Sequence, residues 1–209
     1  MAYRIRMAGP DDAPQLLDVY APYVAETCVS FECEVPSVEA YRDRVASIAR
    51  AYPYLIVESR RDGSEEAPGV VGFAYAHALS ERAAYRWSVE TSVYLAPGET
   101  GVGLGGPLLD ALEELLALSG FACAYACITA DNAASIAFHE RRGYRTCGRF
   151  ENCAFKDGHW LSVVWMEKNL LPRDATPAEP RQAGRRAAED VLARANARLA
   201  AATGRTGAP

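Results

Sequence analysis

The feature that most constrains this chain is a strand joined to a helix by a glycine-rich turn, over residues 87–106. Apolar residues alternate with polar ones over 89–95, which predicts a half-buried strand, and leucines at helical spacing follow the glycines. Backbone N–H groups converge in such a turn, and the helix dipole adds partial positive charge there. The stretch therefore predicts a binding site for an anion such as a pyrophosphate.

The glycines at 101, 103 and 106 also match the GxGxxG pattern of dinucleotide-binding folds. In that motif the first glycine follows the strand almost at once, whereas residues 97–100 intervene here. The preceding strands are expected to form an antiparallel meander rather than a βαβ unit. The pattern alone is weak evidence, and it does not favour a dinucleotide site.

Composition places the chain among ordinary single-domain proteins with a tail. Half of its 209 residues are hydrophobic, and its net charge is −5. The tail after residue 171 holds seven Arg against four Asp and Glu, or +3, which leaves −8 on residues 1–171. This acidic body argues against a nucleic-acid partner. No apolar run approaches the roughly 20 residues that span a bilayer, and the N-terminal residues lack a signal-peptide core, so we expect no membrane contact and a cytoplasmic location.

Hydrophobic periodicity predicts a mixed α/β (α+β) domain over residues 1–171. Strands are expected at 3–7, 53–58, 69–78, 89–95, 121–128, 144–150 and 160–166, with a loop at 60–68 and four helices between them. The tail, 172–209, is expected to be helical or disordered. A helix at 187–202 is supported by alanine content, although its apolar residues offer little to bury. The six cysteines form no CxxC pair and lie at no zinc-finger spacing, so no metal site is expected.

The order of elements and several segments resemble the GCN5-related N-acetyltransferase (GNAT) superfamily, and within it the phosphinothricin and methionine sulfoximine N-acetyltransferases. The segments are YAPYVAETCVSFECEVPS, ERAAYRWSVETSVYL, NAASIAFHERRGY and FKDGHWLSVVW. The resemblance covers residues 3–170. It implies a central sheet of about seven strands, mostly antiparallel on the N-terminal side, whose parallel fourth and fifth strands splay around acetyl-CoA.

The resemblance also implies an acyltransferase that moves acetyl from acetyl-CoA to the α-amino group of a small amino acid, in detoxification or resistance, and that forms a homodimer. An ammonium has no lone pair to attack a thioester, so a general base must remove a proton. Glu90 matches the family's catalytic glutamate. His139 matches the position that handles a proton at the thiol, and imidazole suits either direction of transfer.

Acetyl-CoA is expected to contact the strand, the glycine turn and the following helices. The residues implied are Val93, Tyr94, Leu95, Thr100, Gly101, Val102, Gly103, Leu104, Gly105, Gly106, Asn132 and Ser135. The family usually has basic or amide side chains at 100–102, where this chain has Thr, Gly and Val, so the pyrophosphate would rest on backbone amides alone. Asn132 suits a helix N-cap as well as a contact to the cofactor.

For the acceptor, the resemblance implies a clamp on a carboxylate or phosphinate. Arg82 matches the family's arginine, Arg86 is the alternative, Tyr85 lies nearby, and Phe31 is expected to form an apolar wall. Both arginines equally suit surface charges. Lys156, with Trp160, is expected to cover the site from the same or a partner subunit.

Two other functions remain open. The same transfer to a polyamine, an aminoglycoside or a protein N-terminus would use the same cofactor. A non-catalytic module that binds acetyl-CoA is supported by the altered residues 100–102 alone.

Overall fold

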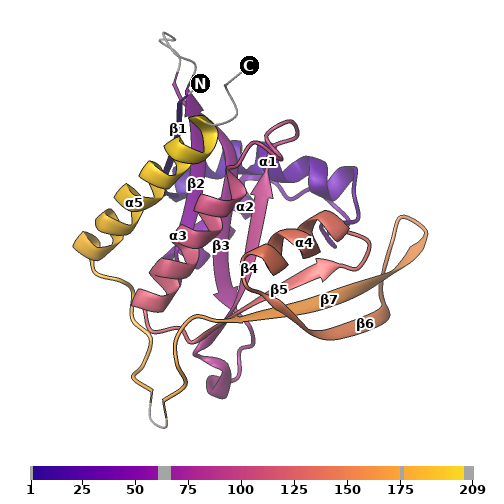
Figure 1. The fold of residues 1–209 in the computed structure, drawn as a ribbon. Helices are drawn as coiled ribbons and strands as arrows, with labels where there is room; N and C mark the ends of the chain where they lie inside the picture. The colour runs from indigo at the N-terminus through magenta and orange to yellow at the C-terminus, as the bar shows by residue number, and fades with distance from the viewer. Residues whose placement is uncertain (1, 61–66, 175–176, 205–209) are drawn as a thin grey trace.

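A computed structural model describes residues 2–60, 67–174 and 177–204, which form one sheet covered by helices on both faces (Figure 1). The strands are β1 (Ala2–Met7), β2 (Tyr54–Arg60), β3 (Gly69–Ala78), β4 (Ser88–Leu95), β5 (Cys123–Thr129), β6 (Arg145–Lys156) and β7 (His159–Asn169). The helices are α1 (Ala13–Ala25), α2 (Val38–Ala51), α3 (Gly105–Leu118), α4 (Ala133–Arg141) and α5 (Arg185–Thr203). Much of the loop expected at 60–68 lies outside the described residues.

The seven strands follow the order β1-β2-β3-β4-β5-β7-β6, and the β4–β5 pair is parallel. This confirms the expected mixed sheet, with its antiparallel meander from β1 to β4. Pairing between β4 and β5 covers only Ser88 to Glu90 on β4, opposite Cys123 to Tyr125. Beyond Glu90 the two strands separate, so backbone groups on that side of β4 face a gap instead of a strand.

Successive side chains of β2 point alternately into two hydrophobic cores, one on each face of the sheet. Tyr54 and Ile56 pack with α1 and α2 on one face, whereas Leu55 and Val57 pack with α3 and α5 on the other. All four side chains are at most 1% exposed. A strand that is buried on both faces reads as a continuous apolar run, which is what residues 53–57 show.

The tail is helical and belongs to the main core. α5 buries Val191, Ala195 and Leu199 against the side of the sheet that α3 covers. The Asn196 side chain also binds the edge strand: its Oδ1 accepts from Ile5 N at 2.7 Å, and its Nδ2 donates to Ile5 O at 3.0 Å. The expectation that this helix has little to bury is therefore wrong, because β1 and α3 leave an apolar surface that only the folded domain creates.

The remaining differences between the predicted and the observed elements lie at the ends of strands and helices. β6 and β7 are longer than the sequence pattern indicates and project as a hairpin beyond the rest of the sheet (Figure 1). Among the described residues, no helix is long and apolar enough to span a bilayer.

Candidate active site

Three adjoining cavities run through the gap where β4 and β5 separate. A groove of about 510 Å³ lies against α3 and α4, and a cavity of about 410 Å³ lies under the loop that joins α1 to α2. A small space of about 60 Å³ lies between them and shares Val93, Ser135 and His139 with the groove. It shares Ser92 and Tyr94, among others, with the second cavity. The passage therefore connects two binding spaces across the sheet, as a transfer between two substrates requires.

The groove collects most of the residues expected to hold the cofactor: Val93, Leu95, Thr100, Gly101, Gly103, Leu104, Gly105, Gly106, Asn132 and Ser135. Gly101 and Gly103 have φ values of +79° and +95°, a backbone conformation that favours glycine. A Cβ on Gly101 would meet no atom within 4 Å, so the loop opens onto free space. Volume and donors both suit a pyrophosphate with its attached pantetheine.

Two of the expected cofactor residues lie elsewhere. Tyr94 lines the small space and the 410 Å³ cavity. Val102 packs against the apolar core beneath the loop. Strand alternation decides the direction of the Tyr94 side chain, and core packing decides that of Val102. The spacing of the glycines predicts neither direction.

Five residues of the groove were not expected from the sequence: Tyr23, Ala134, Phe138, Arg141 and Arg142. They come from α1 and from α4 with the residue that follows it. The two arginines have a signal in the ERRGY segment, where they precede the glycine that ends a helix. Two guanidinium groups therefore line the same groove, and that backbone amides alone face the pyrophosphate stays a prediction.

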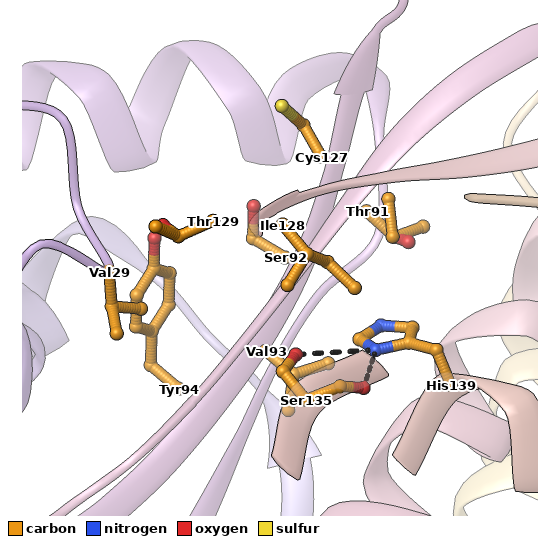
Figure 2. A pocket seen from close by; sticks show the side chains of 11 residues that line it. Val29, Thr91, Ser92, Val93, Tyr94, Cys127, Ile128, Thr129, Ser135 and His139 are labelled. Atoms are coloured by element: carbon orange, nitrogen blue, oxygen red, sulfur yellow. Dashed lines mark hydrogen bonds between the residues drawn. The ribbon is translucent and has the colours of Figure 1, made fainter. Parts of the chain in front are cut away.

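His139 points from α4 toward β4, at the small space between the two larger cavities (Figure 2). Its Nδ1 lies 2.8 Å from the carbonyl oxygen of Ser135 and 3.4 Å from the Ser135 hydroxyl. A carbonyl oxygen only accepts, so Nδ1 carries the hydrogen and Nε2 of the neutral ring is free to accept a proton. Burial lowers the pKa of His139, and the bond to Ser135 partly opposes this. Burial therefore favours the neutral ring.

Asn132 serves as the N-cap of α4 and also lines the groove. Its side-chain oxygen accepts a hydrogen bond from Ser135 N at 3.1 Å. The capping bond leaves the side-chain amide nitrogen as a donor at the edge of the groove. Both interpretations from the sequence are thus compatible with the geometry.

Glu90 lies on β4 at the 410 Å³ cavity, directly opposite His77 of β3 in the strand register. The closest approach is 3.9 Å, from His77 Nε2 to Glu90 Oε2. Burial raises the pKa of the Glu90 carboxyl, and a charge on His77 opposes the rise. A carboxylate with a raised pKa is a better proton acceptor than an exposed one.

The rest of this cavity is aromatic and acidic. Phe31 lines it as expected, together with Tyr75 and Tyr94. Glu32 is a second carboxylate on the wall, and Arg44 of α2 binds it with an Nη1–Oε1 distance of 2.6 Å. Tyr20 also donates to Glu32, at 3.1 Å. The Glu32 charge is thus partly neutralised, whereas Glu90 faces the space.

The expected arginine clamp lies outside the described lining of this cavity. Arg82 and Tyr85 are exposed on the loop before β4. Arg86 pairs with Glu179 of the tail and lies over the Trp87 ring, 5.3 Å from its centroid. Within the described residues, no arginine side chain lines the cavity.

Lys156 does not cover the cavity as expected. It is 4% exposed, and its Nζ donates to the carbonyl oxygens of Val24, Thr27 and Ser30 at 2.7–2.8 Å. An ammonium has three hydrogens, so none remains for a substrate. The side chain instead anchors the loop between α1 and α2, which carries Phe31.

Comparison with known proteins places this geometry in a family. The model of the acetyltransferase (GNAT) domain matches residues 5–165. A phosphinothricin N-acetyltransferase of Streptomyces coelicolor is 34% identical over 167 residues, covering 80% of this chain and 96% of that protein. An L-methionine sulfoximine/L-methionine sulfone acetyltransferase of Pseudomonas aeruginosa is 32% identical, covering 85% and 100%.

Among solved structures, a phosphinothricin acetyltransferase from Sinorhizobium meliloti in complex with acetyl-CoA superposes with a TM-score of 0.78. It is 32% identical and covers 86% of this chain and 95% of its own. The chain belongs to the GNAT acetyltransferase family and is an acetyltransferase. Its relatives support amino-acid N-acetyl transfer from acetyl-CoA as the activity of the group. Among the described residues, no cluster of His, Cys, Asp and Glu could hold a metal ion.

Proposed function

We propose that this enzyme transfers acetyl from acetyl-CoA to the α-amino group of a small amino acid of the phosphinothricin or methionine sulfoximine type. The observation that carries the proposal is the connected passage, with Glu90 on one side of the β4–β5 gap and His139 on the other. The substrates for which relatives at 32–34% identity are named support the substrate class.

Glu90 is proposed to accept the proton of the incoming ammonium, directly or through one water. Its carboxylate faces the acceptor cavity, and burial raises its pKa toward the range in which a general base works at neutral pH. General-base catalysis of this kind contributes roughly 10²–10⁴ in rate.

His139 is proposed to move the second proton. The amine nitrogen loses another hydrogen when it becomes an amide, and the departing thiolate must gain one. Nε2 is the free acceptor of the neutral ring, so it would take this second proton from nitrogen and return one to the sulfur. The ring lines the small space between the two larger cavities, where the amine and the sulfur would meet.

Acetyl-CoA supplies the activated acetyl group when bound. The residues that fit it are the glycine loop at 100–106 for the pyrophosphate and the gap side of β4 for the thioester. Beyond Glu90, the N–H groups of β4 on the gap side have no β5 partner, and the one from Val93 or Tyr94 would polarise the carbonyl.

The acceptor carboxylate needs a cation that the described cavity wall does not provide. We propose that Arg82 reaches it by movement of its exposed loop, or that a second subunit completes the site. The β6–β7 hairpin exposes Phe150, Phe155 and Trp160 at 56%, 56% and 65%. An apolar surface of this kind suits a homodimer interface. Light scattering on the wild type and on Trp160→Glu would test the dimer.

Thiol release with acetyl-CoA tests the function. Phosphinothricin, methionine sulfoximine and methionine sulfone should be acetylated with kcat/KM at least about 100-fold above common amino acids, since matched polar groups discriminate strongly. Turnover confined to polyamines or aminoglycosides would favour the second candidate, another amine. The acidic lining, Glu32 with Glu90 and no described arginine, is the observation that supports that candidate.

A further inference from the structure

The side chain of Arg142 crosses from the end of α4 to the first turn of α3. Its Nη1 donates to both carboxylate oxygens of Asp110, at 2.9 and 3.2 Å. Its Cζ lies 5.9 Å from the centroid of the Phe138 ring. The guanidinium passes so close to Gly106 that a Cβ built there would lie 2.0 Å from Nη2. The Asp110 carboxylate and the Phe138 ring therefore hold the group beside the beginning of α3.

This position lies within the groove at its anion-binding end. Arg142 lines the groove together with Gly103, Gly105 and Gly106, whose segment begins α3. Within the described residues, all hydrogen bonds of the Arg142 side chain leave from Nη1. Nη2, on the Gly106 side, remains a donor for a ligand. The bond to Asp110 orients the guanidinium before any ligand arrives, which lowers the entropic cost of binding.

The glycine loop lacks the charge that this end of the groove needs. Residues 100–102 are Thr, Gly and Val, so the loop offers backbone N–H groups without a cationic side chain. A pyrophosphate brings about two negative charges, and guanidinium is the side chain best suited to bind phosphate oxygens. Gly106 supplies the space, because any larger residue would displace the guanidinium.

We propose that Arg142 binds the pyrophosphate of acetyl-CoA and replaces the basic side chain that the loop lacks. The proposal rests on the use of acetyl-CoA by this enzyme. It makes Arg142 a binding residue with no part in proton transfer, so its loss raises the KM for acetyl-CoA and leaves kcat nearly unchanged.

The neighbouring Arg141 provides a matched control. It carries the same charge, lines the same groove and ends α4, but neither the Asp110 bond nor the Gly106 contact involves it. Arg142→Gln and Arg141→Gln therefore change net charge equally. A general electrostatic effect would weaken acetyl-CoA binding to a similar extent in both variants.

The test is calorimetric titration of the wild type and both variants with acetyl-CoA and with its 3′-dephospho analogue. We expect Arg142→Gln to raise the Kd about ten-fold for both ligands, and Arg141→Gln to raise it less than three-fold. If Arg142→Gln raises the Kd for acetyl-CoA but not the Kd for the 3′-dephospho analogue, Arg142 binds the 3′-phosphate and the proposal is overturned. Equal losses in the two variants would overturn it as well.

Gly106→Ala gives a second route that keeps the charge. Its Cβ would push the guanidinium aside, so this variant should lose affinity, and adding Arg142→Gln should cost little more. Additive losses would contradict a shared site. Thermal unfolding of each variant confirms that the fold is intact.

The outcomes separate this inference from the proposed function. If the wild type binds acetyl-CoA but acetylates no amino acid, the proposed acceptor is wrong while the role of Arg142 still follows from the Kd values. If amino acids are acetylated and Arg142→Gln binds acetyl-CoA like the wild type, only the role of Arg142 fails.

Discussion

His77 and Glu90 face each other across β3 and β4, with Nε2 of the imidazole 3.9 Å from a carboxylate oxygen. The His77 Nδ1 lies 3.0 Å from the carbonyl of Ala78, which only accepts, so Nδ1 carries a hydrogen. When the ring is charged it stabilises the Glu90 carboxylate and lowers its pKa, opposing burial.

This pair predicts how activity depends on pH. Other titratable groups near Glu90 and Tyr75 are Cys127, Glu32 and Arg44, which stay the same in every variant. His77→Gln removes the opposing charge, so the Glu90 pKa rises and the acidic limb of kcat/KM moves to higher pH. His77→Lys keeps a cation and should leave the limb at or below its wild-type position. Identical limbs in all three proteins would show that His77 has no electrostatic role.

Glu90→Gln should separate activity from stability. We expect kcat at pH 7 to fall about 10²- to 10⁴-fold and to recover partly at high pH, where more of the amine is neutral. Burial raises the Glu90 pKa in the folded state, so its contribution to stability is full below the unfolded pKa and is lost as pH rises through the folded one.

The glutamine variant should consequently melt about 2 °C higher than the wild type at pH 8, and this difference should shrink toward pH 4. Calorimetry at the two pH values checks the stability half of the prediction. Unchanged turnover would remove Glu90 from the mechanism.

Lys156→Met should loosen the loop between α1 and α2. Three carbonyls, of Val24, Thr27 and Ser30, lose their donor, at a cost of about 3 kcal/mol in unfolding free energy. Because that loop carries Phe31, the KM for the amino acid should rise while the Kd for acetyl-CoA stays constant. Urea denaturation and steady-state kinetics measure the two effects. A direct substrate contact by Lys156 would instead show normal stability with lost activity.

Leu199→Ala should show that α5 is part of the core. Leu199 is 0% exposed and packs in the cluster that contains α3, so the cavity should cost about 2–4 kcal/mol. Leu192, which is only partly buried on the same helix, is the control and should cost less. The end of α5 also reaches the glycine loop, since a Cβ on Gly103 would lie 3.5 Å from that of Ala202. A weaker Kd for acetyl-CoA should therefore accompany the loss of stability.

Local pattern was sufficient for most of the fold. The alternation over 89–95 and the leucines after residue 106 predicted β4 and α3, because side-chain periodicity depends on the geometry of the element itself. The resemblance of whole segments then indicated the order of the sheet, including the short parallel pairing of β4 with β5. Glu90 and His139 lie at adjoining cavities, and the roles that the resemblance implies for them stay predictions.

What only the tertiary structure decided were contacts between residues far apart in the chain. The sequence shows that Lys156 is a cation in a segment that resembles the family. Only the folded structure shows that its three hydrogens bind the carbonyl oxygens of residues 24, 27 and 30. It shows a glycine at 106 and an arginine at 142 without indicating that one makes room for the other. It likewise gives no sign that α5 has a surface to cover. Each of these depends on which surfaces meet after folding, and no local period encodes that.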